Sequence, residues 1–330
     1  MPLAAWLALH AGISALATWL ALAYARRRNL IDHPGERRSH AVATPRGGGI
    51  GIAIALLAGC ALLPATGRGP TMAMASFATG LVLVAGIGWI DDHRPLSPWL
   101  RLAVQCLAGA LLAWGMHGVE GRWGWALLTL GLVPVLVNVW NFMDGIDGLA
   151  ASQAMLAAVA CAWLAPGIAP LALALAVACA AFLPFNFPHA RIFLGDAGSG
   201  TLGYALAALV AGAAPELGVP MAALLLLPLS AFLVDASLTL VSRVAAGERW
   251  WQPHVSHVYQ RWVRTGRSHA FVTSVYVAFT LAAIVSGAFL HNAGPWPATV
   301  GVMLWLACAV PVWAGLRRRM VPGKVGQEDA

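Results

Sequence analysis

The sequence predicts an all-α fold, a polytopic bundle of about eleven helices that cross a membrane. Of its 330 residues, 60% are apolar and only 10% are charged, whereas soluble chains average about a quarter charged residues. Long apolar runs follow one another along the whole chain. This pattern excludes a soluble enzyme, a disordered chain and a nucleic-acid-binding protein, despite the formal net charge of +7. We expect one membrane domain over residues 1–330, in contact with the lipid bilayer.

The apolar runs define the expected helices in order. Each is close to the roughly 20 residues that a helix needs to cross a bilayer, although the second, sixth and eighth are short. No basic segment precedes the first run, so we expect a retained span and not a cleaved signal. The expected spans are 3–24, 49–64, 72–90, 99–116, 124–141, 150–165, 170–187, 200–214, 219–242, 270–290 and 297–316.

The basic residues indicate an orientation. If successive loops alternate sides, one side receives only Arg68 and Arg122, and the other 18 of the 20 Arg and Lys residues fall on the opposite side. Positive charge is retained in the cytoplasm, so we expect the N-terminus outside and the C-terminus in the cytoplasm. The expected cytoplasmic segments are 25–48, 91–98, 142–149, 188–199 and 243–269.

Three acidic clusters lie at span ends on this cytoplasmic side. They are Asp91 with Asp92, the segment NFMDGIDG at 141–148, and GDAGSG at 195–200. Taken singly, each can be a helix cap or a helix-terminating turn. Carboxylates beside hydrocarbon persist mainly when they are paired, metal-bound or functional. Three clusters on one face therefore indicate a convergent site.

The composition of these segments favours diphosphate chemistry with Mg²⁺, for which Mn²⁺ can substitute. Mg²⁺ binds one or two carboxylates and completes its shell with waters and substrate phosphates. Arginines in the neighbouring loops can neutralise the remaining phosphate oxygens. The sequence therefore predicts a metal-assisted reaction of a diphosphate.

Other polar features have two interpretations each. His254 and His257 can reach a phosphate or move a proton, or they can belong to a solvated loop. The glycines at 47–49 permit close approach to an anionic ligand, or they form a flexible start of a helix. Asp235 lies within a span, where it reaches the site or pairs with a polar neighbour.

Five motifs, in this order, resemble the polyprenyl-phosphate N-acetylhexosamine-1-phosphate transferases, which form glycosyltransferase family 4. They are TPRGGG (44–49), IDDHRPLS (90–97), NVWNFMDGIDGLA (138–150), FNFPHARIFLGDAGSGTLG (185–203) and PHVSHVYQR (253–261). This family includes the bacterial enzymes that start O-antigen and enterobacterial common antigen synthesis, and the phospho-MurNAc-pentapeptide transferase. The resemblance covers residues 32–262 and is closer to the O-antigen branch.

The resemblance implies roles for individual residues. Asp196 corresponds to the principal Mg²⁺ ligand, with Asp91 beside it, and Phe193 corresponds to an aromatic residue that stacks on uracil. The catalytic candidates are Asp91, Asp92, Asp144, His254 and His257. The substrate-binding candidates are Asn141, Asp147, Asn186, Phe193, Arg46, Arg191 and Arg261.

The implied reaction is the attack of undecaprenyl phosphate on the β-phosphate of a UDP-N-acetylhexosamine. UMP leaves, and a polyprenyl-diphospho-sugar forms that primes O-antigen or lipopolysaccharide synthesis. One-step and two-step routes stay open, as does assembly into a homodimer. We expect the enzyme in the bacterial inner membrane, with its active site facing the cytoplasm. The HxxH spacing differs from the adjacent histidines of other branches, so we expect donor choice to depend on residues 249–267.

Two other classes of membrane protein fit the sequence less well. A membrane prenyltransferase that uses a polyprenyl diphosphate would ordinarily carry DxxxD motifs, which DDHRP and DGIDG do not supply. A secondary transporter would place polar residues near the middle of the membrane, and only Asp235 clearly enters a span.

Overall fold

The computed structural model describes residues 1–35, 42–65, 71–249 and 254–320. Parts of two expected cytoplasmic segments, 36–41 and 250–253, lie outside the described residues.

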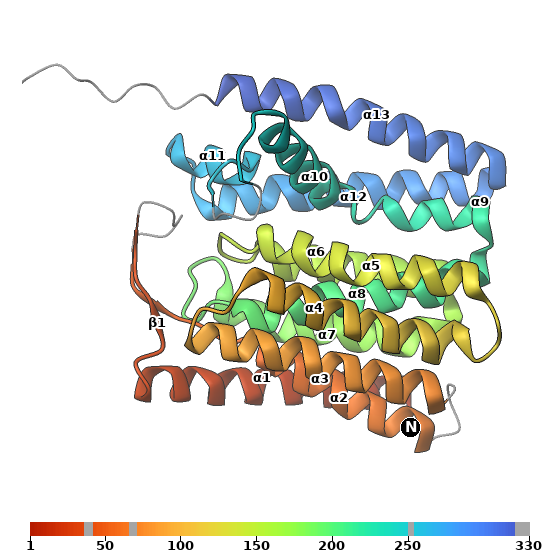
Figure 1. The fold of residues 1–330 in the computed structure, drawn as a ribbon, viewed down its shortest axis with the longest axis horizontal. Coiled ribbons are helices and arrows are strands. Elements are labelled where there is room, and N and C mark those ends of the chain that lie inside the picture. Colours follow the sequence, from red (N-terminus) through yellow and green to blue (C-terminus); the bar gives the residue numbers. More distant parts are fainter. Residues whose placement is uncertain (36–41, 66–70, 250–253, 321–330) are drawn as a thin grey trace, which may run out of the picture.

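Helices run side by side along one long axis (Figure 1). In chain order the helices are α1 (Leu3–Arg27), α2 (Ile50–Ala65), α3 (Thr71–His93), α4 (Pro98–Ala113), the π-helical turn η1 (Trp114–Gly118), α5 (Trp123–Phe142), α6 (Leu149–Leu164), η2 (Pro166–Ile168), α7 (Ala169–Asn186), α8 (Gly195–Leu217), α9 (Val219–Ala222), η3 (Ala223–Leu226), α10 (Ser230–Ala245), α11 (Val258–Arg264), α12 (His269–Ala293) and α13 (Pro295–Arg319).

The described strands form one small antiparallel pair. Strand β1 (Ile31–Asp32) lies against β2 (Thr44–Pro45), with Ile31 opposite Pro45 and Asp32 opposite Thr44. This pair lies at the end of the bundle that also holds α11, opposite the end where the chain begins (Figure 1). The arginines of the last turns of α1 and α13 are at this same end. We call it the basic end.

The expected all-α membrane fold is confirmed. Within the described chain, eight helices are long and apolar enough to cross a membrane. The pair Val219–Leu226 and Ser230–Ala245 makes a ninth if it is counted as one span, and Ile50–Leu63 and Leu149–Leu164 are shorter apolar helices. Every expected run thus coincides with helix, while the total of eleven and the N-out orientation stay predictions.

The expected span at 219–242 is not one straight helix. Its two halves meet at an angle of 79°, and Pro228 lies at the break. Proline has no N–H to donate and its ring clashes with the carbonyl one turn earlier. The sequence pattern showed the apolar length of this segment but not its bend.

Helix α8 forms the centre of the bundle, with 94% of an 18-residue apolar stretch of the helix buried. It packs mainly on α5 and α3, and its many glycines and alanines let neighbouring backbones approach closely. At Gly88 of α3, a Cβ atom would lie 2.4 Å from the carbonyl oxygen of Asp196. This contact fixes the first turn of α8 against the last turns of α3.

Two helix ends differ from the expected boundaries. Helix α3 continues to His93, so Asp91 and Asp92 lie in its last turn and not in a loop. Helix α8 begins at Gly195, five residues before the expected span, so Asp196 lies in its first turn. The acidic residues therefore stand on helix ends, where the backbone holds them in fixed positions.

Candidate active site

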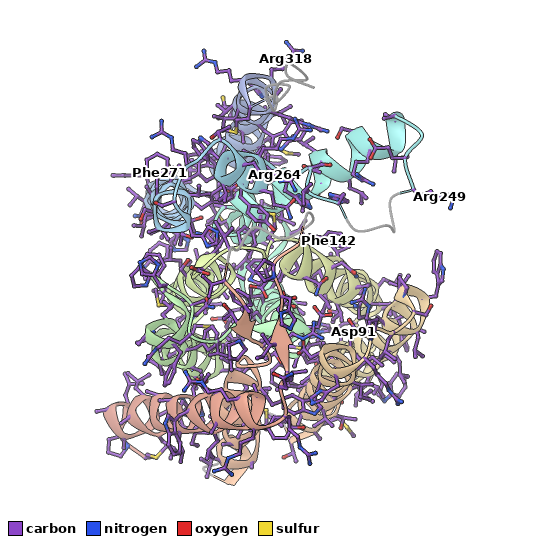
Figure 2. All side chains as sticks on the ribbon, turned by 90° about the vertical axis from the view of Figure 1, so that its left-hand side faces the viewer. Asp91, Phe142, Arg249, Arg264, Phe271 and Arg318 are labelled. Atoms are coloured by element: carbon purple, nitrogen blue, oxygen red, sulfur yellow. The ribbon has the colours of Figure 1, made fainter. Side chains whose placement is uncertain are left out.

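A cavity of about 670 Å³ opens at the basic end of the bundle. Figure 2 looks onto this end, with Asp91 and Phe142 near the middle and Arg249, Arg264 and Arg318 above them. The cavity brings together residues from α3, α4, α5, α8, α10 and α11 and from the loops between them. The expected site residues that line it are Arg46, Asp92, Asn141, Asp144, Asn186, Phe193, Asp196, His254 and His257.

Asp196 lies at the centre of a polar network on the cavity wall. Its Oδ1 accepts a hydrogen bond from Nδ2 of Asn141 at 2.7 Å, and its Oδ2 lies 3.2 Å from Nη1 of Arg101. The same Arg101 nitrogen contacts Oδ2 of Asp91 at 2.8 Å. About 32% of the Asp196 side chain is exposed, so its carboxylate can still accept another partner.

Arg101 is the functional residue that sequence reasoning missed. It lies in the first turn of α4 and joins the two carboxylates expected to act together. In the sequence it is only one of many basic residues on the expected cytoplasmic side. Its distance of ten residues from Asp91 gave no sign of contact, because the turn between α3 and α4 brings the two together.

Asp92 caps the first turn of α8. Its Oδ1 accepts from the backbone N–H of Asp196 at 3.0 Å, and its Oδ2 accepts from the N–H of Ala197 at 3.2 Å. The residue is 1% exposed. The first N–H groups of a helix lack partners within the helix, and a carboxylate there is favourable. The structure therefore gives Asp92 a structural role, whatever part it takes in the chemistry.

The glycines at 47–49 contact protein backbone and not a ligand. The N–H of Gly48 donates to the carbonyl of Phe193, and that of Gly49 to Leu194, both at 2.9 Å. A Cβ atom on Gly49 would lie 2.3 Å from Cα of Gly198. Because their N–H groups are already paired with backbone carbonyls, the contacts of Gly48 and Gly49 favour the second alternative, the start of a helix. Arg46, which precedes them, lines the cavity and donates to the backbone carbonyl of Asp92.

Asp144 lies in the connection between α5 and α6 and lines the cavity. Burial raises the pKa of its carboxyl to about 8, with further increases from the negative charges of Asp92 and Asp147. Asp144 is thus a carboxyl group that holds its proton near neutral pH in the protein alone. A nearby cation would favour its ionised form.

Asp147 and Asn186 hold this connection in place. Oδ2 of Asp147 lies 3.1 Å from Nδ1 of His269 at the start of α12. The amide of Asn186 accepts from the N–H of Gly148 at 2.8 Å and donates to the carbonyl of Ile192 at 3.0 Å. Asp147 is not among the residues that line the cavity. Asp147 and Asn186 thus hold in place the loops that carry Asp144 and Phe193.

Two arginines expected to bind substrate lie outside the cavity lining. Arg191 is exposed, donates to the carbonyl of Pro184 at 2.8 Å and lies 5.0 Å above the Phe185 ring. Arg261 donates to the carbonyls of Ser256 and Arg317. Local contacts hold both side chains outside the cavity lining, and their roles in substrate binding stay predictions. Phe193, by contrast, is half-buried on the cavity wall.

The two histidines lie side by side on the cavity, with ring centroids 4.9 Å apart. Burial lowers the pKa of His254 to about 4, with additional lowering from His257 and Arg243. His254 is therefore neutral at neutral pH and can accept a proton or a hydrogen bond. His257 is 2% exposed, and its Nδ1 lies 3.8 Å from Oδ1 of Asp235. Asp235 itself pairs with polar neighbours, one of the two alternatives that the sequence left open.

The fold and the site together define an integral membrane protein whose cavity, at the basic end, is lined by carboxylates, arginines and histidines beside apolar side chains. Comparisons with known proteins give the family. The sequence model of glycosyl transferase family 4 matches residues 74–213. The decaprenyl-phosphate N-acetylglucosaminephosphotransferase of Mycolicibacterium smegmatis is 32% identical, over 94% of this chain and 89% of the relative. The counterpart of that name from Mycobacterium leprae is 31% identical, over 78% and 76%. A phospho-N-acetylmuramoyl-pentapeptide-transferase of Trichormus variabilis is 36% identical over about half of each chain.

The chain belongs to glycosyl transferase family 4. It is an enzyme, a sugar-phosphate transferase, as its relatives are. The family expected from the five motifs is thus confirmed, and the prenyltransferase and transporter alternatives are wrong. The O-antigen branch stays a prediction.

Proposed function

We propose that this protein transfers an N-acetylhexosamine-1-phosphate from a UDP-N-acetylhexosamine to undecaprenyl phosphate in a Mg²⁺-dependent reaction. An oxygen of the lipid phosphate forms a bond to the β-phosphorus of the donor. The bond from that phosphorus to the bridging oxygen breaks, and UMP leaves. The observation that carries the proposal is that Asp196 contacts both Arg101 and Asn141 on the wall of one cavity. Asp91 does not line the cavity itself and is bound to the same Arg101.

The donor set suits Mg²⁺. Asp196 and Asp91 offer carboxylate oxygens around a single cation, Arg101, and the exposed part of Asp196 faces the cavity. Mg²⁺ favours one or two protein carboxylates and leaves the remaining positions to waters and phosphates. Asp196 and Asp91 would hold the ion, which when bound supplies positive charge to the diphosphate oxygens.

The chain's own residues then align and neutralise the reacting groups. Phosphoryl transfer depends mostly on positioning and on charge stabilisation. Arg46 and Arg101 line the cavity and can bind phosphate oxygens in pairs of hydrogen bonds. Asn141 keeps Asp196 in one orientation. Neutral His254 and protonated Asp144 are groups that can exchange a proton with the lipid phosphate.

The cavity also has an apolar wall that supports a lipid substrate. It comprises Trp99 and Leu102 of α4, Pro134, Val135 and Val139 of α5, and Ala236 and Leu240 of α10. Helices α4 and α5 are long and apolar enough to cross a membrane, and so is the bent segment that contains α10. A polyprenyl chain could therefore reach the carboxylates from the bilayer. Phe193, which also lines the cavity, can stack on the base of the nucleotide.

The relatives suggest which donor to test first. The Mycolicibacterium smegmatis and Mycobacterium leprae enzymes are named for N-acetylglucosamine, so UDP-N-acetylglucosamine is our first candidate. We further propose that the product primes O-antigen or lipopolysaccharide synthesis. The enzyme would lie in the bacterial inner membrane with the basic end in the cytoplasm.

The test is a reconstituted reaction. Purified protein in nanodiscs is mixed with undecaprenyl phosphate, Mg²⁺ or Mn²⁺, and each of several donors: UDP-N-acetylglucosamine, UDP-N-acetylgalactosamine and a 6-deoxy analogue. We expect UMP and a lipid diphosphate in equal amounts, and neither product in EDTA. UMP release that does not depend on the lipid phosphate, or none with any donor, would refute the proposal.

Donor selection can be tested in the same reaction. Replacing residues 249–267 by the corresponding loop of a relative with adjacent histidines should change the ratio of kcat/KM between UDP-N-acetylglucosamine and the 6-deoxy donor. A site that pairs with a hydroxyl group rejects the analogue that lacks it strongly. An unchanged ratio in an active chimera would place selection in residues 32–46.

A further inference from the structure

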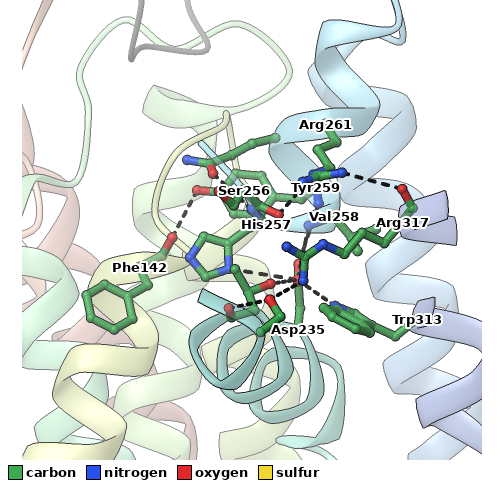
Figure 3. Close-up of polar contacts among 12 residues, drawn as sticks. Phe142, Asp235, Ser256, His257, Val258, Tyr259, Arg261, Trp313 and Arg317 are labelled. Carbon is green, nitrogen blue, oxygen red and sulfur yellow. Dashed lines mark hydrogen bonds and ion pairs between the residues drawn. The ribbon is translucent and has the colours of Figure 1, made fainter. Parts of the chain in front are cut away.

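Asp235 is a buried carboxylate that gathers hydrogen-bond donors from four helices. It lies in α10 and is 2% exposed. Its contacts come from α10 itself and from α11, α12 and α13 (Figure 3). Oδ1 accepts from the N–H of Val258 at 3.0 Å, Nε1 of Trp313 at 3.1 Å and the hydroxyl of Thr239 at 3.2 Å. Oδ2 accepts from the hydroxyl of Tyr276 at 2.8 Å and the N–H of Tyr259 at 3.5 Å. Such partners offset the cost of burying a charge.

The two backbone donors belong to the first turn of α11, which carries cavity residues. His257 precedes this helix, and its ring lies 3.8 Å from Asp235. The Tyr259 hydroxyl donates to the carbonyl of Phe142 at 3.0 Å, at the end of α5. His254, His257, Tyr259 and Gln260 all line the cavity. Asp235 therefore fixes the wall that we call the histidine wall, residues 254–260.

Helix α13 packs against α10 and α11, the helices that carry Asp235 and two of its backbone donors. Only 11% of an 18-residue apolar stretch of α13 is buried. Apolar packing therefore contributes little to holding α13 against the core. Near its end, the guanidinium of Arg317 lies 5.1 Å above the Trp313 ring and donates to the hydroxyl of Ser242. The carbonyl of Arg317 accepts from Arg261 of α11 at 3.5 Å. The last turns of α13 thus contact both α10 and α11.

We propose that α13 positions the histidine wall through the hydrogen bond from Trp313 to Asp235. This inference rests on the proposed function, because it takes the histidine wall to face the sugar-phosphate donor. Asp235 and Trp313 are positioning residues, and neither lines the cavity. Removing the indole N–H leaves a buried carboxylate with one donor fewer, so the turn that it caps becomes less well fixed.

A matched pair of variants tests the proposal. Trp313→Phe removes the indole N–H and keeps an aromatic ring beneath Arg317. The control is Trp305→Phe, which removes a comparable bond of 3.1 Å from α13 to the hydroxyl of Ser230, also on α10. We expect kcat/KM to fall about tenfold in Trp313→Phe, which corresponds to about 1.4 kcal/mol, and to change less than twofold in Trp305→Phe. Equal losses in the two variants would overturn the proposal.

A second measurement does not require activity. Hydrogen–deuterium exchange of the peptide that contains Val258 and Tyr259 reports directly on the two N–H groups bound to Asp235. Exchange should become faster in Trp313→Phe and stay unchanged in Trp305→Phe, with α8 protected in both. Tyr276→Phe, which removes a donor from α12, should act in the same direction and serves if Trp313→Phe does not fold. Unchanged exchange in a folded Trp313→Phe, or in Tyr276→Phe where that variant has to serve, would overturn the proposal. A wild-type protein that releases no UMP would refute only the proposed function.

Discussion

The carboxylate of Asp92 and the backbone N–H of Asp196 are joined by a hydrogen bond of 3.0 Å. Through it, the end of α3 fixes the beginning of α8. The side chain of Asp196 is then held from the other side by Asn141 at 2.7 Å. Two adjacent aspartates thus have different surroundings, because Asp91 contacts Arg101 while Asp92 contacts backbone N–H groups.

Asp196→Asn should reduce UMP release by more than about a hundredfold without loss of protein yield. The substitution removes a carboxylate oxygen that could bind a metal ion but preserves the shape of the side chain. The measurement is the initial rate across a series of Mg²⁺ concentrations. Near wild-type rates at saturating Mg²⁺ would contradict the assignment of Asp196 as a metal ligand.

Asp92→Ala should destabilise the protein by about 1–2 kcal/mol, the usual cost of losing a helix cap. Asp92→Asn should recover part of this loss, because one side-chain oxygen remains to accept a hydrogen bond. Thermal unfolding in detergent measures the difference, with Asp196→Asn as the control, which keeps the cap. If Asp92→Ala melts at the wild-type temperature, the capping role is wrong.

Arg101 and Arg191 should respond differently to substitution by alanine. Arg101→Ala should lower kcat/KM by about a hundredfold, because Arg101 lines the cavity and contacts both Asp91 and Asp196. Arg191→Ala should retain near wild-type activity, since that side chain is directed to Pro184 and Phe185. A large loss in Arg191→Ala would show that the loop moves toward the substrate during turnover.

Asp144 should make the stability of the metal-free protein depend on pH. Its carboxyl has a pKa of about 8 in the folded protein, against about 3.9 in an unfolded chain. The folded state therefore holds the proton more tightly, and this stabilisation is present below pH 4 and is lost as the pH rises toward 8. In EDTA, Asp144→Asn should melt above the wild type at pH 8, and the difference should shrink toward pH 5. A difference independent of pH would mean that Asp144 is already ionised.

Much of the fold and the identity of the site could be predicted from the sequence. Each apolar run coincides with helix, because a helix must present about 20 apolar residues to cross a bilayer. Carboxylates are costly next to hydrocarbon, so the few acidic residues at the ends of spans marked the site. Most of the residues chosen on this basis line one cavity.

The contacts of these residues were decided by the tertiary structure. Spacing along the chain cannot show that Asp196 meets Asn141, 55 residues away, or that Trp313 meets Asp235, 78 residues away. Nor does a motif give the direction of a side chain, so the sequence did not show that local carbonyls bind Arg191 and Arg261. The apolar pattern determined which segments enter the membrane, because transfer from water depends on composition and length. Helix packing determined which polar groups meet, because hydrogen bonds and ion pairs require atoms within about 3 Å in defined directions.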